Sequence, residues 1–135
     1  MHSYNYKITN QVYNWIVNGT KRIEIRLYND KTSKINIGDY ITFKVLNNEK
    51  KCIKVQVKAI LRYKNIYELL NDFDIKLIAD ASYSSKGLEN MLNNIYGKEK
   101  VSNHNVVGIK FKLIKEDDIL ISETIDKDIY VKKTN

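Results

Sequence analysis

The six residues from Arg22 to Leu27 alternate strictly between charged and apolar side chains. This period of two residues is that of a β-strand, and it is incompatible with a helix over the same segment. The strand should carry one apolar face and one charged face, formed respectively by Ile23, Ile25, Leu27 and by Arg22, Glu24, Arg26. The fold must therefore supply an apolar partner on one side of this strand.

A short amphipathic helix is predicted just before the strand. Thr9 or Asn10 can cap its first turn, and Gly19 stands where a residue of left-handed conformation ends a helix. Apolar residues recur at the spacing of one helix face, namely at Val12, Trp15 and Ile16. The chain thus turns from helix to strand within a few residues of Gly19.

The remaining pattern predicts further strands at 41–45, 53–58 and 106–114, and helices at 67–73 and from Ser84 or Ser85 to Tyr96. Residues 119–131 could add one or two edge strands. The order favours an α+β fold built on a small, mostly antiparallel sheet or barrel. With 135 residues and neither repeats nor a linker, we expect one domain over 1–135.

Composition narrows the functional classes. No apolar run approaches the roughly 20 residues that span a bilayer, and the N-terminus lacks the apolar core of a signal peptide. Cys52 is the only cysteine, which excludes an internal disulfide and a multi-cysteine zinc site. His2 and His104 are isolated, so we expect no metal and no cofactor. A cytoplasmic location follows as an expectation.

Charge is unevenly distributed along the chain. Residues 1–115 hold 20 of the 23 Lys and Arg and 10 of the 16 Asp and Glu, a net charge of +10, whereas residues 116–135 carry −3. A basic body with an acidic extension suits a polyanionic partner, because neutralising phosphates releases counterions. A lysine-rich solvated surface is the alternative.

The spacing of Gly19, Lys21, Glu24 and Arg26 forms the pattern G-x-K-x-x-E-x-R, which is the hallmark of ASCH domains. The chain also resembles this family in the Gly38-Asp39 pair that opens a strand. Two later segments fit as well, Leu92–Gly97 and Val106–Ile109. The resemblance covers roughly residues 8–114 and leaves 115–135 as an acidic C-terminal extension.

The resemblance implies a PUA-like small mixed or antiparallel β-barrel with flanking helices and a cleft beside the G-x-K-x-x-E-x-R segment. Members of the family are thought to bind RNA, and a few are hydrolases acting on RNA or on acylated pyrimidine nucleosides. The amidohydrolase branch uses a lysine, a threonine three residues on, and a glutamate ahead of the late helix. Here Lys21 is kept, Glu24 takes the threonine position, and Asp80 stands where the glutamate would be.

Glu24 and Arg26 are neighbours on one strand face, so a charge-assisted pair can form between them. In a binding site, Lys21 or Arg26 would meet a phosphate and Glu24 a base edge; the alternative is a surface ion pair of little consequence. Lys21 falls in phase with the apolar face, so either the strand starts after it or the chain twists there. A partly desolvated ammonium would have a depressed pKa.

Other residues can extend a binding surface. Arg22 belongs to the same segment, and Lys54 and Lys58 would form a positive stripe with Lys110 and Lys112 if their strands are neighbours. Seven tyrosines are possible stacking platforms for bases, of which Tyr28 and Tyr40 flank the loop after the G-x-K-x-x-E-x-R strand: Tyr4, Tyr6, Tyr28, Tyr40, Tyr63, Tyr83 and Tyr96.

Three functions remain open. The first is an RNA- or nucleotide-binding module that uses a cleft around the G-x-K-x-x-E-x-R segment. The second is a small hydrolase acting on RNA or a modified nucleoside, with Lys21 and Glu24 as catalytic residues. The third is a protein-interaction module that uses the acidic extension or an exposed barrel edge.

Overall fold

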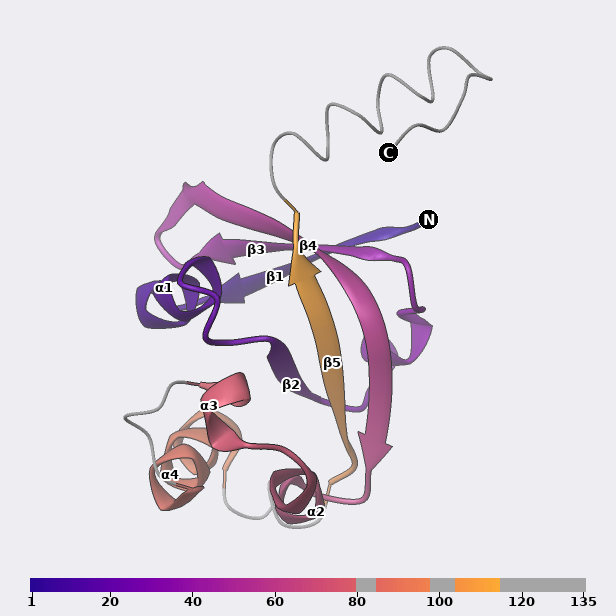
Figure 1. Cartoon of the computed structure of the whole chain (residues 1–135), viewed down its shortest axis with the longest axis vertical. Helices are drawn as coiled ribbons and strands as arrows, with labels where there is room; N and C mark the ends of the chain where they lie inside the picture. The colour runs from indigo at the N-terminus through magenta and orange to yellow at the C-terminus, as the bar shows by residue number, and fades with distance from the viewer. Residues whose placement is uncertain (80–84, 98–103, 115–135) are drawn as a thin grey trace.

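Five strands form one curled sheet in the spatial order β1-β3-β4-β5-β2 (Figure 1). The first strand pairs parallel with β3, and the other three pairings are antiparallel. The strands are β1 (Ser3–Ile8), β2 (Ile23–Leu27), β3 (Tyr40–Val45), β4 (Asn48–Tyr63) and β5 (Val106–Leu113). Because the sheet curls, its two edge strands β1 and β2 approach one another (Figure 1).

The computed structural model describes residues 1–79, 85–97 and 104–114. Its helices are α1 (Asn10–Val17), η1 (Thr32–Lys34), α2 (Ile66–Asp72), α3 (Ile75–Ile78) and α4 (Ser85–Tyr96). The predicted helices and strands are present, whereas β1 and α3 were not expected from the sequence. Asp80, Tyr83, the acidic extension and the edge strands considered for 119–131 lie outside the described residues.

The concave side of the sheet encloses the first core. Alternate residues of four strands point inward, and Ile16 of α1 closes one end. Phe43 and Phe111 pack with their ring centroids 5.8 Å apart. This core contains Tyr6, Ile8, Ile16, Ile35, Ile41, Phe43, Val55, Val57, Val107, Ile109 and Phe111. The alternation of apolar and polar residues expected for β3, β4 and β5 is therefore present, and it places the apolar residues in this core.

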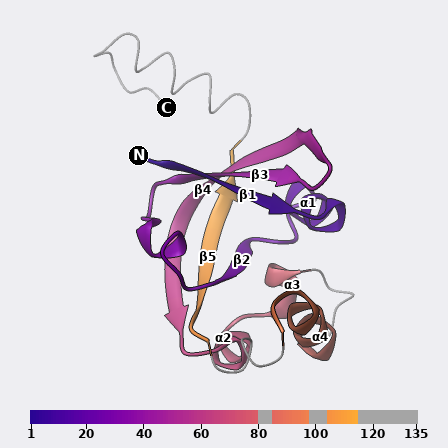
Figure 2. The ribbon, with the colours of Figure 1, turned by 180° about the vertical axis from the view of Figure 1, so that it is seen from behind.

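A second core lies on the opposite face of β2 and β5. Ile23 and Ile25 pack there against α2, α3 and α4, which Figures 1 and 2 show grouped on this side of the sheet. Gly108 allows the closest approach, since a Cβ at this position would lie 3.1 Å from Leu69 Cδ1. Both faces of β2 are consequently covered, including the face that carries the buried Glu24.

The α+β class and the small mixed sheet with flanking helices are confirmed. The sheet is a curled half-barrel whose remaining gap lies between the edges of β1 and β2. Among the described residues, no helix combines the length and the apolar character needed to cross a membrane. The gap between β1 and β2 lies where the G-x-K-x-x-E-x-R segment enters the sheet.

Leu69→Ala should lower the free energy of unfolding by about 3 kcal/mol, because Leu69 is fully buried in the second core and the truncation leaves a cavity. Urea denaturation followed by circular dichroism measures the loss. Leu46→Ala is the matched control, since Leu46 is 48% exposed. A loss at Leu69 no greater than that at Leu46 would show that α2 does not pack on β5 as described.

Candidate functional site

Lys21 reaches the interior because the chain makes a tight connection between α1 and β2. Gly19 adopts φ +81°, and the backbone N–H groups of Thr20 and Lys21 both donate to the carbonyl of Trp15. The strand itself begins at Ile23. Of the two explanations for the phase of Lys21, the structure therefore supports a strand that starts after it.

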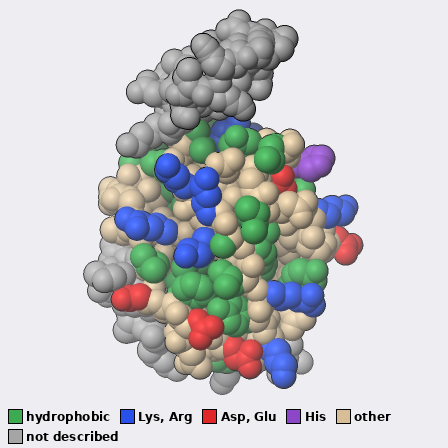
Figure 3. Space-filling view, turned by 45° about the vertical axis from the view of Figure 1, so that its right-hand side comes forward, with side chains coloured by type: hydrophobic (Ala, Val, Ile, Leu, Met, Phe, Trp, Pro, Cys, Tyr) green, Lys and Arg blue, Asp and Glu red, His purple; other side chains and the backbone are tan. Residues whose placement is uncertain are grey.

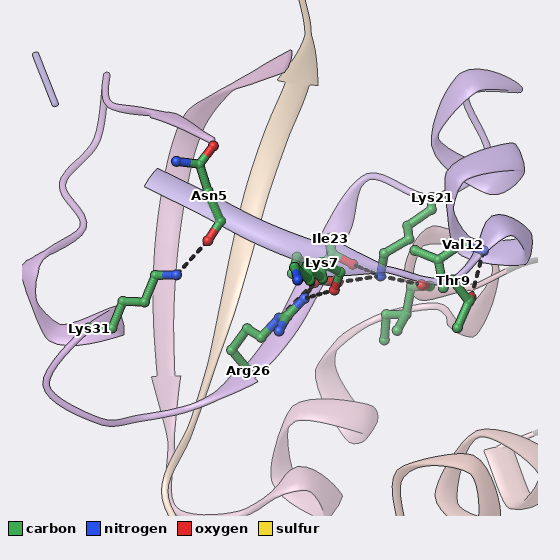
Figure 4. A network of polar contacts seen from close by, with 10 residues as sticks. Asn5, Lys7, Thr9, Val12, Lys21, Ile23, Arg26 and Lys31 are labelled. Carbon is green, nitrogen blue, oxygen red and sulfur yellow. Dashed lines mark hydrogen bonds and ion pairs between the residues drawn. The ribbon is translucent and has the colours of Figure 1, made fainter. Parts of the chain in front are cut away.

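The Lys21 ammonium is buried and fully hydrogen-bonded. Its Nζ donates to the carbonyl of Ile23 at 2.7 Å and to the carbonyl of Ile78 at 2.8 Å, and it lies 3.1 Å from Glu24 Oε1. Figure 4 shows the side chain extending from its loop toward these acceptors. An ammonium has three hydrogens, so these three partners use its whole donor capacity.

Glu24 is a buried carboxylate held between two cations. Its Oε1 faces Lys21, while its Oε2 accepts from Nε of Arg26 at 2.8 Å and lies 2.8 Å from Nη2 of Arg26. The side chains of Lys21 and Glu24 are 6% and 8% exposed, whereas that of Arg26 is 22% exposed. The alternative of a surface ion pair is thus wrong, and Arg26 is the member of this triad that reaches solvent.

Arg26 also bridges the gap between the two edge strands. Its Nη2 donates to the carbonyl of Lys7 in β1 at 3.3 Å, and its guanidinium stacks 4.3 Å from the centre of the Tyr6 ring. Lys31 joins from the loop after β2, with its Nζ 3.9 Å from the same ring and bonded to the carbonyl of Asn5 (Figure 4). Side chains, not a backbone ladder, therefore close the half-barrel here.

Burial and opposite charge shift the pKa values of the triad. Burial lowers the pKa of Lys21, although Glu24 opposes this shift. For Glu24, burial acts to raise the pKa, but the two cations outweigh it and the pKa lies below its usual value. Arg26 has a raised pKa despite its burial, because Glu24 stabilises its charged form. The carboxylate is thus ionised at neutral pH.

The triad forms one wall of a cleft of about 240 Å³. The opposite walls come from α1, α3, α4 and the β3–β4 turn, so segments distant in sequence enclose it. They are largely apolar: Val12, Leu46, Ile78, Leu92, Ile95 and Tyr96. Leu46 and Ile95 are 48% and 61% exposed and form part of its rim. The charged groups of Lys21 and Glu24 and the partly exposed guanidinium of Arg26 therefore face an apolar wall that contains Tyr96.

Five predicted binding residues do not line this cleft. Arg22 is exposed and its Nε donates to the carbonyl of Gly19. Tyr28 stacks with Arg62 and Tyr40 with Lys54, on other parts of the sheet. Lys58 donates to Gln56 at 3.0 Å. The structure brings together Lys21, Glu24 and Arg26 and places the remaining five elsewhere.

Sequence reasoning did not single out several cleft residues. Tyr96 was one of seven tyrosines considered, and only its place on the apolar face of a helix next to Leu92 set it apart. Ile95 lies in the segment Leu92–Gly97 that fits the family, whereas Leu46 had no signal, because an exposed apolar residue is common at any surface. Within the described residues, no group of three His, Cys, Asp or Glu side chains could hold a metal ion.

Comparison with known families identifies one match over most of the chain. The model of the ASCH domain matches residues 7–115, which include every element from α1 to β5. No curated protein matches the chain significantly.

Solved structures of similar shape agree with the family match. The crystal structure of hypothetical protein PH0355 has 28% identity and a TM-score of 0.72, and the match covers 83% of this chain and 99% of that one. The solution structure of PF0455 from Pyrococcus furiosus has 27% identity and a TM-score of 0.63, with 84% and 98% covered. A mutant of ZmASCH from Zymomonas mobilis, at 11% identity and a TM-score of 0.57, shares the fold over 97% of this chain and 82% of its own.

In the Glu24→Gln variant, the free energy of unfolding should no longer depend on the protonation of a carboxyl group at position 24. Because the folded pKa of Glu24 is lowered, its stabilisation is complete above the usual glutamate pKa of about 4.3 and is lost as pH falls through the folded value. At pH 7 the variant should lose about 3–5 kcal/mol, since Lys21 keeps its charge without a counter-ion, and this deficit should shrink at lower pH.

Urea denaturation at a series of pH values measures both effects. Glu49→Gln, at the exposed tip of the β3–β4 hairpin, is the matched control. If the two variants lost the same free energy of unfolding at pH 7, the buried triad would not contribute significantly to the stability of the fold.

Proposed function

This chain belongs to the ASCH domain family, and we propose that it binds RNA, with one nucleotide or nucleobase in the cleft beside Lys21, Glu24 and Arg26. ASCH domains are generally thought to bind RNA, which sets the class of ligand. The observation that carries the proposal is the contrast between the two walls of the cleft. One is charged and held rigid by buried contacts, and the other is apolar and contains Tyr96.

The size and chemistry of the cleft suit a planar, partly apolar group. A volume of about 240 Å³ lies just below the range of about 300–1,000 Å³ that is usual for small-molecule pockets, so the cleft suits a single base or nucleoside better than a longer segment. The apolar wall and Tyr96 can pack against the faces of a ring, as aromatic platforms do in single-strand binding. Arg26, 22% exposed, offers the accessible charge at the edge.

A hydrolase acting through Lys21 and Glu24 is supported less well by this geometry. A general base needs an accessible lone pair, but the Lys21 ammonium is engaged with two carbonyls and one carboxylate. Both oxygens of Glu24 are likewise occupied by cations. The lowered pKa of Lys21 favours reactivity, yet its buried partners hold it as a positioned cation.

Ile95→Trp should weaken the binding of a single nucleotide by at least about tenfold, because the larger side chain would fill the rim of the cleft. Titration of wild type and variant with uridine, cytidine, adenosine and guanosine monophosphates, followed by NMR chemical shifts, measures this. Ile37→Trp adds the same bulk at a residue that is 64% exposed and does not line the cleft. Equal binding by both variants would exclude this cleft as the nucleotide site.

Wild-type protein incubated with single-stranded RNA and with acylated nucleosides should bind without forming products, as monitored by chromatography. Turnover that disappears in Lys21→Ala and Glu24→Ala, while both variants keep the wild-type circular dichroism spectrum, would instead establish a hydrolase. The folding check is needed because either substitution leaves a buried charge without its partner.

A further inference from the structure

The outer face of the sheet, away from the first core, carries a row of lysines that the helices leave uncovered. Lys110 and Lys112 alternate along β5, and Lys112 lies opposite Gln56 in β4. Lys54 in β4 lies opposite Thr42 in β3. We call this surface the outer lysine face; it comprises Lys44, Lys54, Lys58, Lys110 and Lys112. The stripe expected from adjacent β4 and β5 is therefore present.

The β-bulge in β4 adds Lys58 to this face. The register shifts between Val57 and Ala59, so that Lys58 has no partner residue in β5. Its Nζ donates to Gln56, whose own side chain bonds to the carbonyl of Gly38. Lys58 thus points to the same side as Gln56 and Lys112, and it is exposed.

The outer lysine face carries none of the carboxylates whose side chains the structure describes. Among those carboxylates, Glu24 and Asp39 are buried, and the exposed ones are in the loop after β2, at the hairpin tip and in or just after α2: Asp30, Glu49, Glu68, Asp72 and Asp74. Glu24 forms its ion pairs with Lys21 and Arg26, inside the triad. Figure 3 likewise shows Lys and Arg side chains gathered in its upper left, whereas most visible Asp and Glu side chains lie lower.

The outer lysine face is continuous with the rim of the cleft through Lys7. This residue lines the cleft and lies beside Lys44 in the parallel pairing of β1 with β3. From there the lysines cross β3 and β4 to β5, a span of about 15 Å at the usual spacing between strands. Lysines two apart on one strand are about 7 Å apart, which is comparable with successive phosphates of an extended strand.

The cleft and the outer lysine face differ in how far carboxylates balance their positive charge. In the cleft, Glu24 offsets one of the two positive charges of Lys21 and Arg26, so the triad carries a net charge of +1. Within the described residues, the lysines of the outer face have no carboxylate partner of this kind.

We propose that the outer lysine face binds the phosphate backbone of a single RNA strand that extends from the cleft past Lys7. The choice of RNA rests on the proposed function, whereas the location rests on the lysines themselves. Affinity and salt dependence then come from the outer face, and any preference for a base comes from the cleft.

The double variant Lys54→Gln with Lys112→Gln tests this. Binding of an RNA of about twelve nucleotides should weaken about tenfold, and the slope of log K against log salt should fall by about 1.4, or about 0.7 per lost phosphate contact. Nucleoside monophosphate binding should not change. Lys34→Gln with Lys64→Gln removes the same charge from exposed residues outside the outer lysine face and should alter the slope little.

The outcomes separate the two proposals. If both double variants lose equal affinity, only net charge matters and the outer face is not a site. If the outer-face variant binds normally while Ile95→Trp does not, the cleft stands and the outer face fails. The reverse result supports the outer face and excludes the cleft. Equal lysine-dependent binding of duplex RNA or of phosphatidylserine vesicles would overturn the assignment to a single strand.

Discussion

A carboxylate buried between two cations organises the region where this half-barrel closes. Glu24 holds Lys21 on one side and Arg26 on the other, and each cation then bonds to backbone carbonyls of other segments. Lys21 ties the start of β2 to α3, and Arg26 ties β2 to β1. A buried ion cluster gives little net stability relative to an apolar core, and here its hydrogen bonds join β2 to α3 and to β1. The position of α3 and of the cleft walls follows from it.

The same cluster explains why binding chemistry should be divided between two surfaces. Charges that hold a fold together are engaged by their partners and are poor contacts for a ligand's phosphates. The lysines of the outer face have the opposite character, since they stay hydrated in the free protein and remain available. The proposed division would combine a cleft of low net charge and a track of outer-face lysines in one small domain.

Much of the fold could be predicted because its signals are local. The alternation from Arg22 to Leu27, the helix ending at Gly19 and the pairing of Glu24 with Arg26 all depend on residues a few positions apart. The strand β1 was missed although Tyr4, Tyr6 and Ile8 alternate with polar residues, because its only partner is a parallel strand more than thirty residues away. The burial of Glu24 could not be foreseen for the same reason, since β1 and α1 create it. The cleft residues Leu46, Ile95 and Tyr96 come together only through tertiary packing.

The closure by side chains has a consequence for solubility. An exposed strand edge offers unpaired carbonyl and amide groups to the edge of another molecule, and such contacts start aggregation. The carbonyls of Asn5 and Lys7 on the free edge of β1 are instead taken by Lys31 and Arg26. Their positive charges, stacked on Tyr6, would also repel a second copy approaching this edge. At the gap between β1 and β2, the edge of β1 therefore offers fewer free carbonyl groups to a foreign strand.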